Sequence, residues 1–118
     1  MPLSNLAECI RETTSDCEAN GLAAPVLGHI GDGNFHVIFL LDPERPDELA
    51  TIKAVNGRLI DRALAMGGTA TGEHGVGAGK IRALEAEHGD AVEVMRSIKQ
   101  ALDPANLMNP GKVFRPDS

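Results

Sequence analysis

Residues 23–41 read AAPVLGHIGDGNFHVIFLL, and this stretch decides the fold class. Apolar runs flank a Gly-Asp-Gly-Asn cluster at residues 31–34, which is the pattern of two strands joined by a tight turn. An Asp-Gly pair favours a two-residue type I′ turn, and that register places His29 opposite His36. We therefore predict a β-hairpin whose two histidines are cross-strand neighbours on one face.

The rest of the chain reads as helices separated by glycine- and proline-containing breaks. The predicted elements are a helix from a Ser4 cap to about Asn20, a helix over residues 47–66, a loop over residues 69–80, one or two helices broken near Gly89 and ended by Asp103 and Pro104, and a turn over residues 109–112. The predicted fold class is α+β, with an antiparallel β-hairpin or sheet flanked by helices. Because two strands leave both edges open, we expect further sequence or a second copy of the chain to complete the sheet.

Composition narrows the class of protein. At 118 residues the chain is one domain at most, and its net charge of -6 with three Phe and no Trp or Tyr argues against nucleic acid as a partner. No run approaches the roughly 20 apolar residues of a membrane-spanning helix, and the N-terminus lacks an apolar signal core. Helical spacing places Cys9 and Cys17 too far apart for a disulfide. These features predict a cytoplasmic location.

The chemistry lies in the hairpin and in the glycine-rich loop. His29, His36 and Glu73 form a set of two imidazoles and one carboxylate, which is a common arrangement for a catalytic metal. The adjacent His74 then remains as a proton acceptor at neutral pH. The same sequence also fits a structural interpretation, in which His29 and His36 are partly buried histidines bonded to the backbone and no metal binds.

Three ordered motifs carry a resemblance to a known family. They are GHIGDGNFH at residues 28–36, TATGEHGVGAGK at residues 69–80, and LDP followed by LMNPGKV within residues 102–113. Together they resemble the C-terminal signature of the FAD-linked oxidases of the vanillyl-alcohol oxidase type. Within that family the motifs most resemble the cytochrome-type D-lactate dehydrogenases, with the glycolate oxidase flavin subunit and D-2-hydroxyglutarate dehydrogenase as near relatives.

The resemblance implies a role for each polar residue of the first two motifs. His29, His36 and Glu73 would hold a divalent metal, expected to be zinc, at the 2-hydroxyl and carboxylate of the substrate. His74 would take the hydroxyl proton while hydride passes from C2 to the flavin. Asn34 is implied as a substrate-binding residue.

The resemblance also places the whole chain within a larger enzyme. Residues 1–118 would be the incomplete C-terminal half of a cap domain with a helical C-terminal tail, and the FAD-binding domain would be absent. Asn109 is implied to face the flavin, and a cytochrome or quinone is the implied electron acceptor. Ile38 occupies a position that is polar in relatives acting on dicarboxylic acids, which favours a small, lactate-like 2-hydroxy acid.

Further expectations concern the activity and the assembly of the isolated chain. The basic residues that hold the substrate carboxylate in this family have no match here, so the isolated chain is expected to be inactive. The alternative function is a free-standing metal-binding or interaction module without oxidoreductase activity. In either case the open sheet edge predicts a homo-oligomer.

Overall fold

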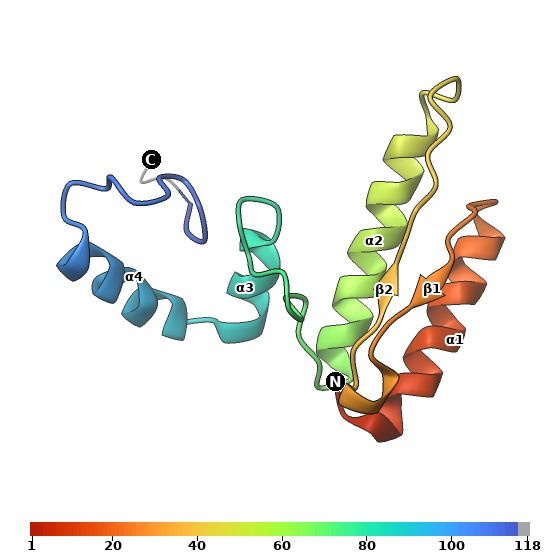
Figure 1. Cartoon of the computed structure of the whole chain (residues 1–118), viewed down its shortest axis with the longest axis horizontal. Helices are drawn as coiled ribbons and strands as arrows, with labels where there is room; N and C mark the ends of the chain where they lie inside the picture. Colours follow the sequence, from red (N-terminus) through yellow and green to blue (C-terminus); the bar gives the residue numbers. More distant parts are fainter. Residues whose placement is uncertain (116–118) are drawn as a thin grey trace. The chain divides into compact units, whose positions relative to one another are not determined.

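The computed structural model describes residues 1–115 of the chain. Contacts divide the chain into two compact units, Met1–Thr69 and Ala70–Ser118. The elements of the first unit are α1 (Leu3–Ala19), β1 (Val26–Leu27), the 3-10 turn η1 (Ile30–Asp32), β2 (His36–Val37) and α2 (Glu48–Ala65), and those of the second are α3 (Ile81–His88) and α4 (Ala91–Leu102) (Figure 1). Over residues 1–115 this is a mostly helical α+β arrangement with one two-stranded antiparallel sheet, so the predicted fold class is confirmed.

The helices lie close to their predicted limits, but the start of α1 differs. Pro2 occupies the position before the helix with a φ of -55°, and no side chain caps it. The Ser4 hydroxyl lies inside the helix and donates to the Asn5 side chain. The predicted Ser4 cap is therefore wrong, because a proline has a φ suited to helix entry and no N–H to satisfy.

The strands pair in a register that differs from the predicted one. Val26 lies opposite Val37 and Leu27 opposite His36, so the predicted pairing of His29 with His36 is wrong. A type I′ turn needs positive φ at both central residues, whereas Asp32 belongs to the 3-10 turn and Gly33 alone of the two has a left-handed φ of 71°. The register is displaced by two positions, so the residues of the two paired strands keep the faces that they would have in the predicted register.

One face of the hairpin packs on the two helices of its unit. The buried centre comprises Cys17, Leu22 and Val55, and the side chains packed against it are Ala24, Val37, Phe39 and Ile52. Val55 is fully buried, which stabilises this unit by roughly 1.5–3 kcal/mol relative to an exposed side chain. Cys9 and Cys17 are both free and buried.

The opposite face of the hairpin is apolar and exposed. Hydrogen bonds continue the pairing beyond the assigned strands, from Ile38 N to Pro25 O and from Leu40 N to Ala23 O, each at 3.0 Å. Pro25 has no N–H to donate in return, which explains why the assigned strands are short. Ile38 and Leu40 on this face are 45% and 55% exposed. The predicted self-association through the open sheet stays a prediction.

No helix within the described residues combines the length and apolar character needed to span a bilayer.

Candidate functional site

Three of the predicted site residues lie around the tip of the hairpin. His29 is exposed, and its backbone oxygen accepts hydrogen bonds from the N–H groups of Asp32 at 2.9 Å and Asn34 at 3.3 Å. Asn34 and His36 are half-buried. A backbone hydrogen bond therefore joins Asn34 to His29 at the tip. His36 lies on β2, where it pairs with Leu27 of β1.

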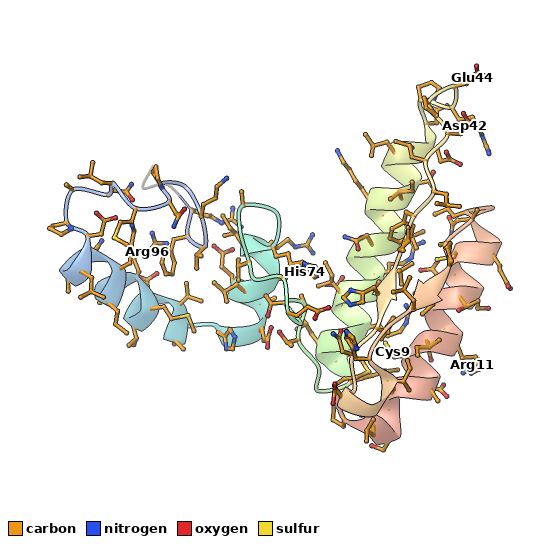
Figure 2. All side chains as sticks on the ribbon, in the orientation of Figure 1. Cys9, Arg11, Asp42, Glu44, His74 and Arg96 are labelled. Carbon is orange, nitrogen blue, oxygen red and sulfur yellow. The ribbon has the colours of Figure 1, made fainter. Side chains whose placement is uncertain are left out.

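The predicted metal ligand Glu73 and the predicted proton acceptor His74 lie in the second unit. Figure 2 shows His74 on the loop that precedes α3. Its Nε2 lies 3.8 Å from Glu73 Oε1, and the two side chains are 73% and 46% exposed. Gly72 and Gly75 have φ values of 36° and 73°, so the backbone turns on both sides of the pair in a region that favours glycine. This accounts for the glycines at these two positions.

Asn109 occupies a turn in the C-terminal tail of the same unit. Its φ is 47°, and its backbone oxygen accepts a hydrogen bond from Lys112 N at 3.2 Å. Asparagine tolerates this left-handed conformation better than most residues. Val113 N then donates to Gly77 O at 2.7 Å. The tail turn is thus tied to the glycine-rich loop that carries Glu73 and His74.

Asp103 holds the C-terminal tail in place, although its predicted role was only to end a helix. It is 8% exposed. Its carboxylate accepts hydrogen bonds from the Lys99 ammonium, from Leu107 N at 2.9 Å and from Met108 N at 2.8 Å. These donors, with Lys99 first, lower the pKa of Asp103 to about 2. The available signal was its place in the LDP motif, directly before the segment that leads to Asn109.

The pKa of Asp103 predicts how the tail responds to acid. Because this pKa falls from 3.8 in the unperturbed group to about 2, the ionised carboxylate stabilises the tail above pH 3.8, and this stabilisation is lost as the pH falls through about 2. We expect the amide proton shifts of Leu107 and Met108 to titrate with a midpoint near the lower value, as measured by NMR. Asp103→Asn removes the titration and serves as the control. A midpoint at the unperturbed value would contradict the prediction.

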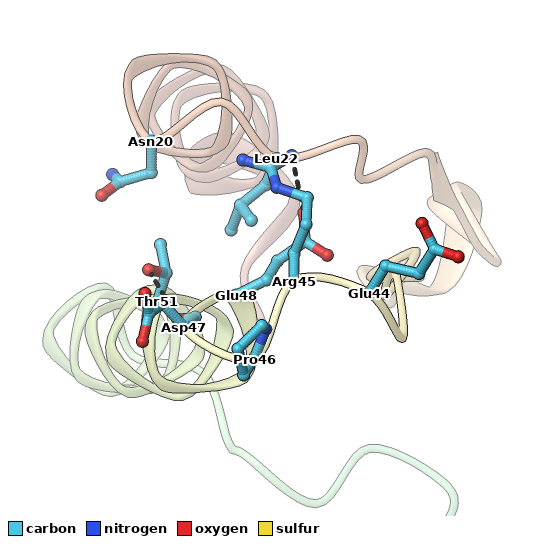
Figure 3. Close-up of a pocket in the computed structure, with 8 residues that line it drawn as sticks. All are labelled: Asn20, Leu22, Glu44, Arg45, Pro46, Asp47, Glu48 and Thr51. Carbon is cyan, nitrogen blue, oxygen red and sulfur yellow. Dashed lines mark hydrogen bonds and ion pairs between the residues drawn. The ribbon is translucent and has the colours of Figure 1, made fainter.

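A pocket in the first unit contains none of the predicted site residues. Its lining residues are Asn20, Leu22, Glu44, Arg45, Pro46, Asp47, Glu48 and Thr51 (Figure 3). Glu48 accepts a hydrogen bond from Asp42 N at 2.6 Å and pairs with Arg45 at 3.4 Å. Since its carboxylate is already engaged within the loop that leads into α2, we do not assign this pocket to the site.

Comparison with known proteins provides evidence independent of this geometry. Residues 1–113 match the family model described as FAD linked oxidases, C-terminal domain. The probable mitochondrial D-lactate dehydrogenase of Danio rerio is 51% identical over 115 residues, covering 97% of this chain and 23% of that protein. The mitochondrial D-lactate dehydrogenase [cytochrome] of Arabidopsis thaliana is 44% identical, covering 98% and 21%. The glycolate oxidase subunit GlcD of Bacillus subtilis is 33% identical, covering 100% and 25%.

Two consequences follow from these relatives. The chain spans only about a fifth to a quarter of the length of the curated relatives it matches. The prediction of a cytoplasmic location is wrong, because the two D-lactate dehydrogenases among them are described as mitochondrial.

Proposed function

Because the chain belongs to the family of FAD-linked oxidase C-terminal domains, we propose that it is the C-terminal part of an FAD-dependent D-2-hydroxy acid dehydrogenase. The observation that carries the proposal is the 51% identity with a probable D-lactate dehydrogenase over 97% of this chain. The same likeness supports a lactate-like substrate. In this proposal residues 1–118 are the substrate side of the enzyme, and a separate portion binds most of the flavin.

The donor atoms of three residues suit a divalent metal. His29 and His36 supply imidazoles from the hairpin, and Glu73 supplies a carboxylate from the glycine-rich loop. Two imidazoles and one carboxylate form a borderline donor set that zinc accepts. His29 and Glu73 are exposed, and His36 is half-buried on a strand whose backbone pairs with Leu27. A zinc ion held there would supply positive charge to the substrate hydroxyl and carboxylate.

His74 is proposed to move the proton of the reaction. Oxidation of a 2-hydroxy acid to a 2-oxo acid removes a hydride from C2 and a proton from the hydroxyl group. FAD, when bound, supplies the acceptor for the hydride and its two electrons. The imidazole of His74 is exposed and lies beside the Glu73 carboxylate, so a neutral ring can receive the hydroxyl proton.

Two asparagines complete the proposed site. Asn34, whose backbone N–H donates to the His29 carbonyl at the hairpin tip, is proposed to bind the substrate. Asn109 lies in the turn tied to the glycine-rich loop, and we propose that it faces the flavin. A cytochrome as electron acceptor and a mitochondrial location are proposed from the names of the relatives. A quinone is the alternative acceptor implied by the family resemblance.

Flavin reduction tests this proposal. The chain joined to its flavin-binding portion is mixed anaerobically with D-lactate, and the oxidised flavin absorbance is followed. We expect rapid bleaching with D-lactate and little with L-lactate. A flavin that is bound but not reduced by any small 2-hydroxy acid would contradict the proposal. If the chain still bound zinc in that case, the result would favour the free-standing metal-binding module.

A further inference from the structure

We propose that Asp103 and Lys99 form a positioning pair that fixes the turn of Asn109 and the loop of Glu73 and His74. We call this pair the tail clamp. The inference rests on the proposed function, because it assigns importance to the places of Asn109, Glu73 and His74. It adds two residues that act through others and touch no substrate.

The tail clamp binds the backbone of the C-terminal tail. Asp103 accepts the N–H groups of Leu107 and Met108, and Lys99 Nζ donates both to the Asp103 carboxylate and to Met108 O, the latter at 2.6 Å. Both backbone polar groups of Met108 are therefore bound. The Lys99 and Asp103 side chains are only 25% and 7% exposed, which shields these charge-assisted bonds from water.

Backbone contacts lead from the tail clamp to the glycine-rich loop. Met108 directly precedes Asn109, whose left-handed turn is closed by Lys112. Val113 then meets Gly77 through its N–H. Val113 has a φ of 69°, a conformation that a β-branched residue adopts only when surrounding contacts impose it. The contact with Gly77 is therefore part of a constrained turn.

A second set of contacts anchors the chain after the turn of Asn109. Arg96 of α4 lies over the Phe114 ring, 5.3 Å from its centroid, and donates to Arg115 O at 3.2 Å. Arg115 donates two hydrogen bonds of 2.7 Å to the Glu85 carboxylate of α3. The segment with Asn109 is thus held at both ends, by the tail clamp before it and by these contacts after it. The glycine-rich loop has few apolar side chains that could pack it in place. The hydrogen bond from Val113 N to Gly77 O therefore allows the tail to position this loop.

The test compares Asp103→Asn with Asp90→Asn in the full 118-residue chain. Asp90 precedes α4, is exposed and makes no cap hydrogen bond through its side chain, so it matches the chemical change without touching the tail. Amide hydrogen exchange is measured at Leu107, Met108 and Val113. We expect exchange to accelerate by about tenfold or more at all three in Asp103→Asn, as expected for the loss of a charge-assisted bond, and to stay unchanged in the control.

A spectroscopic readout separates positioning from simple stability. The ring signals of His74 are expected to shift in Asp103→Asn, while the amide signals of helix α1 stay in place. Faster exchange at Leu107 and Met108 with unchanged Val113 and His74 would overturn the proposal, since the clamp would then act only locally.

A second variant covers the case in which Asp103→Asn unfolds the second unit. Lys99→Gln removes the ammonium but keeps the Asp103 bonds to the backbone, so we expect the same changes at Val113 and His74 with smaller size. Unchanged signals at both residues in Lys99→Gln would equally overturn the proposal. None of these measurements uses metal, flavin or substrate, so the flavin reduction test of the proposed function succeeds or fails separately.

Discussion

His36→Ala is expected to lower the zinc affinity of the chain by more than about a hundredfold, because residues that merely orient a metal ligand already contribute ten- to a hundredfold. The imidazole of His36 extends from a strand whose register is fixed by pairing with Leu27. Its replacement leaves one imidazole and one carboxylate from the proposed set, which is fewer than the three protein ligands of a catalytic zinc site. Zinc titration by calorimetry, with elemental analysis of the purified chain, measures the change.

His88→Ala is the matched control for this loss. His88 lies at the end of α3, where its Nε2 is 3.7 Å from the Glu87 carboxylate, and it belongs to no proposed ligand set. The control also removes one imidazole, from an exposed position, whereas His36 is half-buried. We expect it to bind about one equivalent of zinc with unchanged affinity. Equal affinities of His36→Ala and His88→Ala would refute the ligand role of His36, and a wild-type chain that binds no zinc would favour the structural interpretation of the histidines.

The helices could be predicted from the sequence because their signals are local. Apolar residues recur at helical spacing in α2 and α4, and glycine or proline marks the ends. The hairpin was also predictable, since apolar runs flank a single turn cluster. Its register was not, because it depends on the φ of Asp32. An Asp-Gly pair permits a type I′ turn but does not require one, and here the chain forms a 3-10 turn instead.

For the site, too, the sequence predicted what depends on local residue types and missed what depends on contacts in the folded chain. The types of donor at His29, His36, Glu73 and His74 could be listed from the sequence, and their motifs led to the correct family. The role of Asp103 could not be predicted, because it depends on backbone N–H groups that reach the carboxylate only when the chain reverses after α4. The predicted cytoplasmic location was wrong for a different reason. Composition and free cysteines carry little information about the compartment in which a protein works.

His74→Gln, made in the enzyme joined to its flavin-binding portion, is expected to lower kcat for D-lactate by about a hundredfold to ten-thousandfold. This is the range that a positioned proton acceptor contributes. Glutamine approximates the size and hydrogen-bonding capacity of the ring but cannot accept the proton. We expect zinc content and KM to change little, because the proposed ligands His29, His36 and Glu73 are intact. Steady-state kinetics as a function of pH provide the measurement.

The pH profile separates loss of the proton acceptor from a disturbed loop. In the wild-type enzyme the rate should rise with pH as an essential group loses its proton, and this limb should disappear in His74→Gln. A loop that is only displaced would lower the rate and keep the limb. His88→Gln makes the same change on α3 and should leave both rate and profile as they are. A His74→Gln enzyme that retains the limb at near wild-type rate would assign the proton transfer to another group, and the exposed pair of Glu73 and His74 would then serve binding alone.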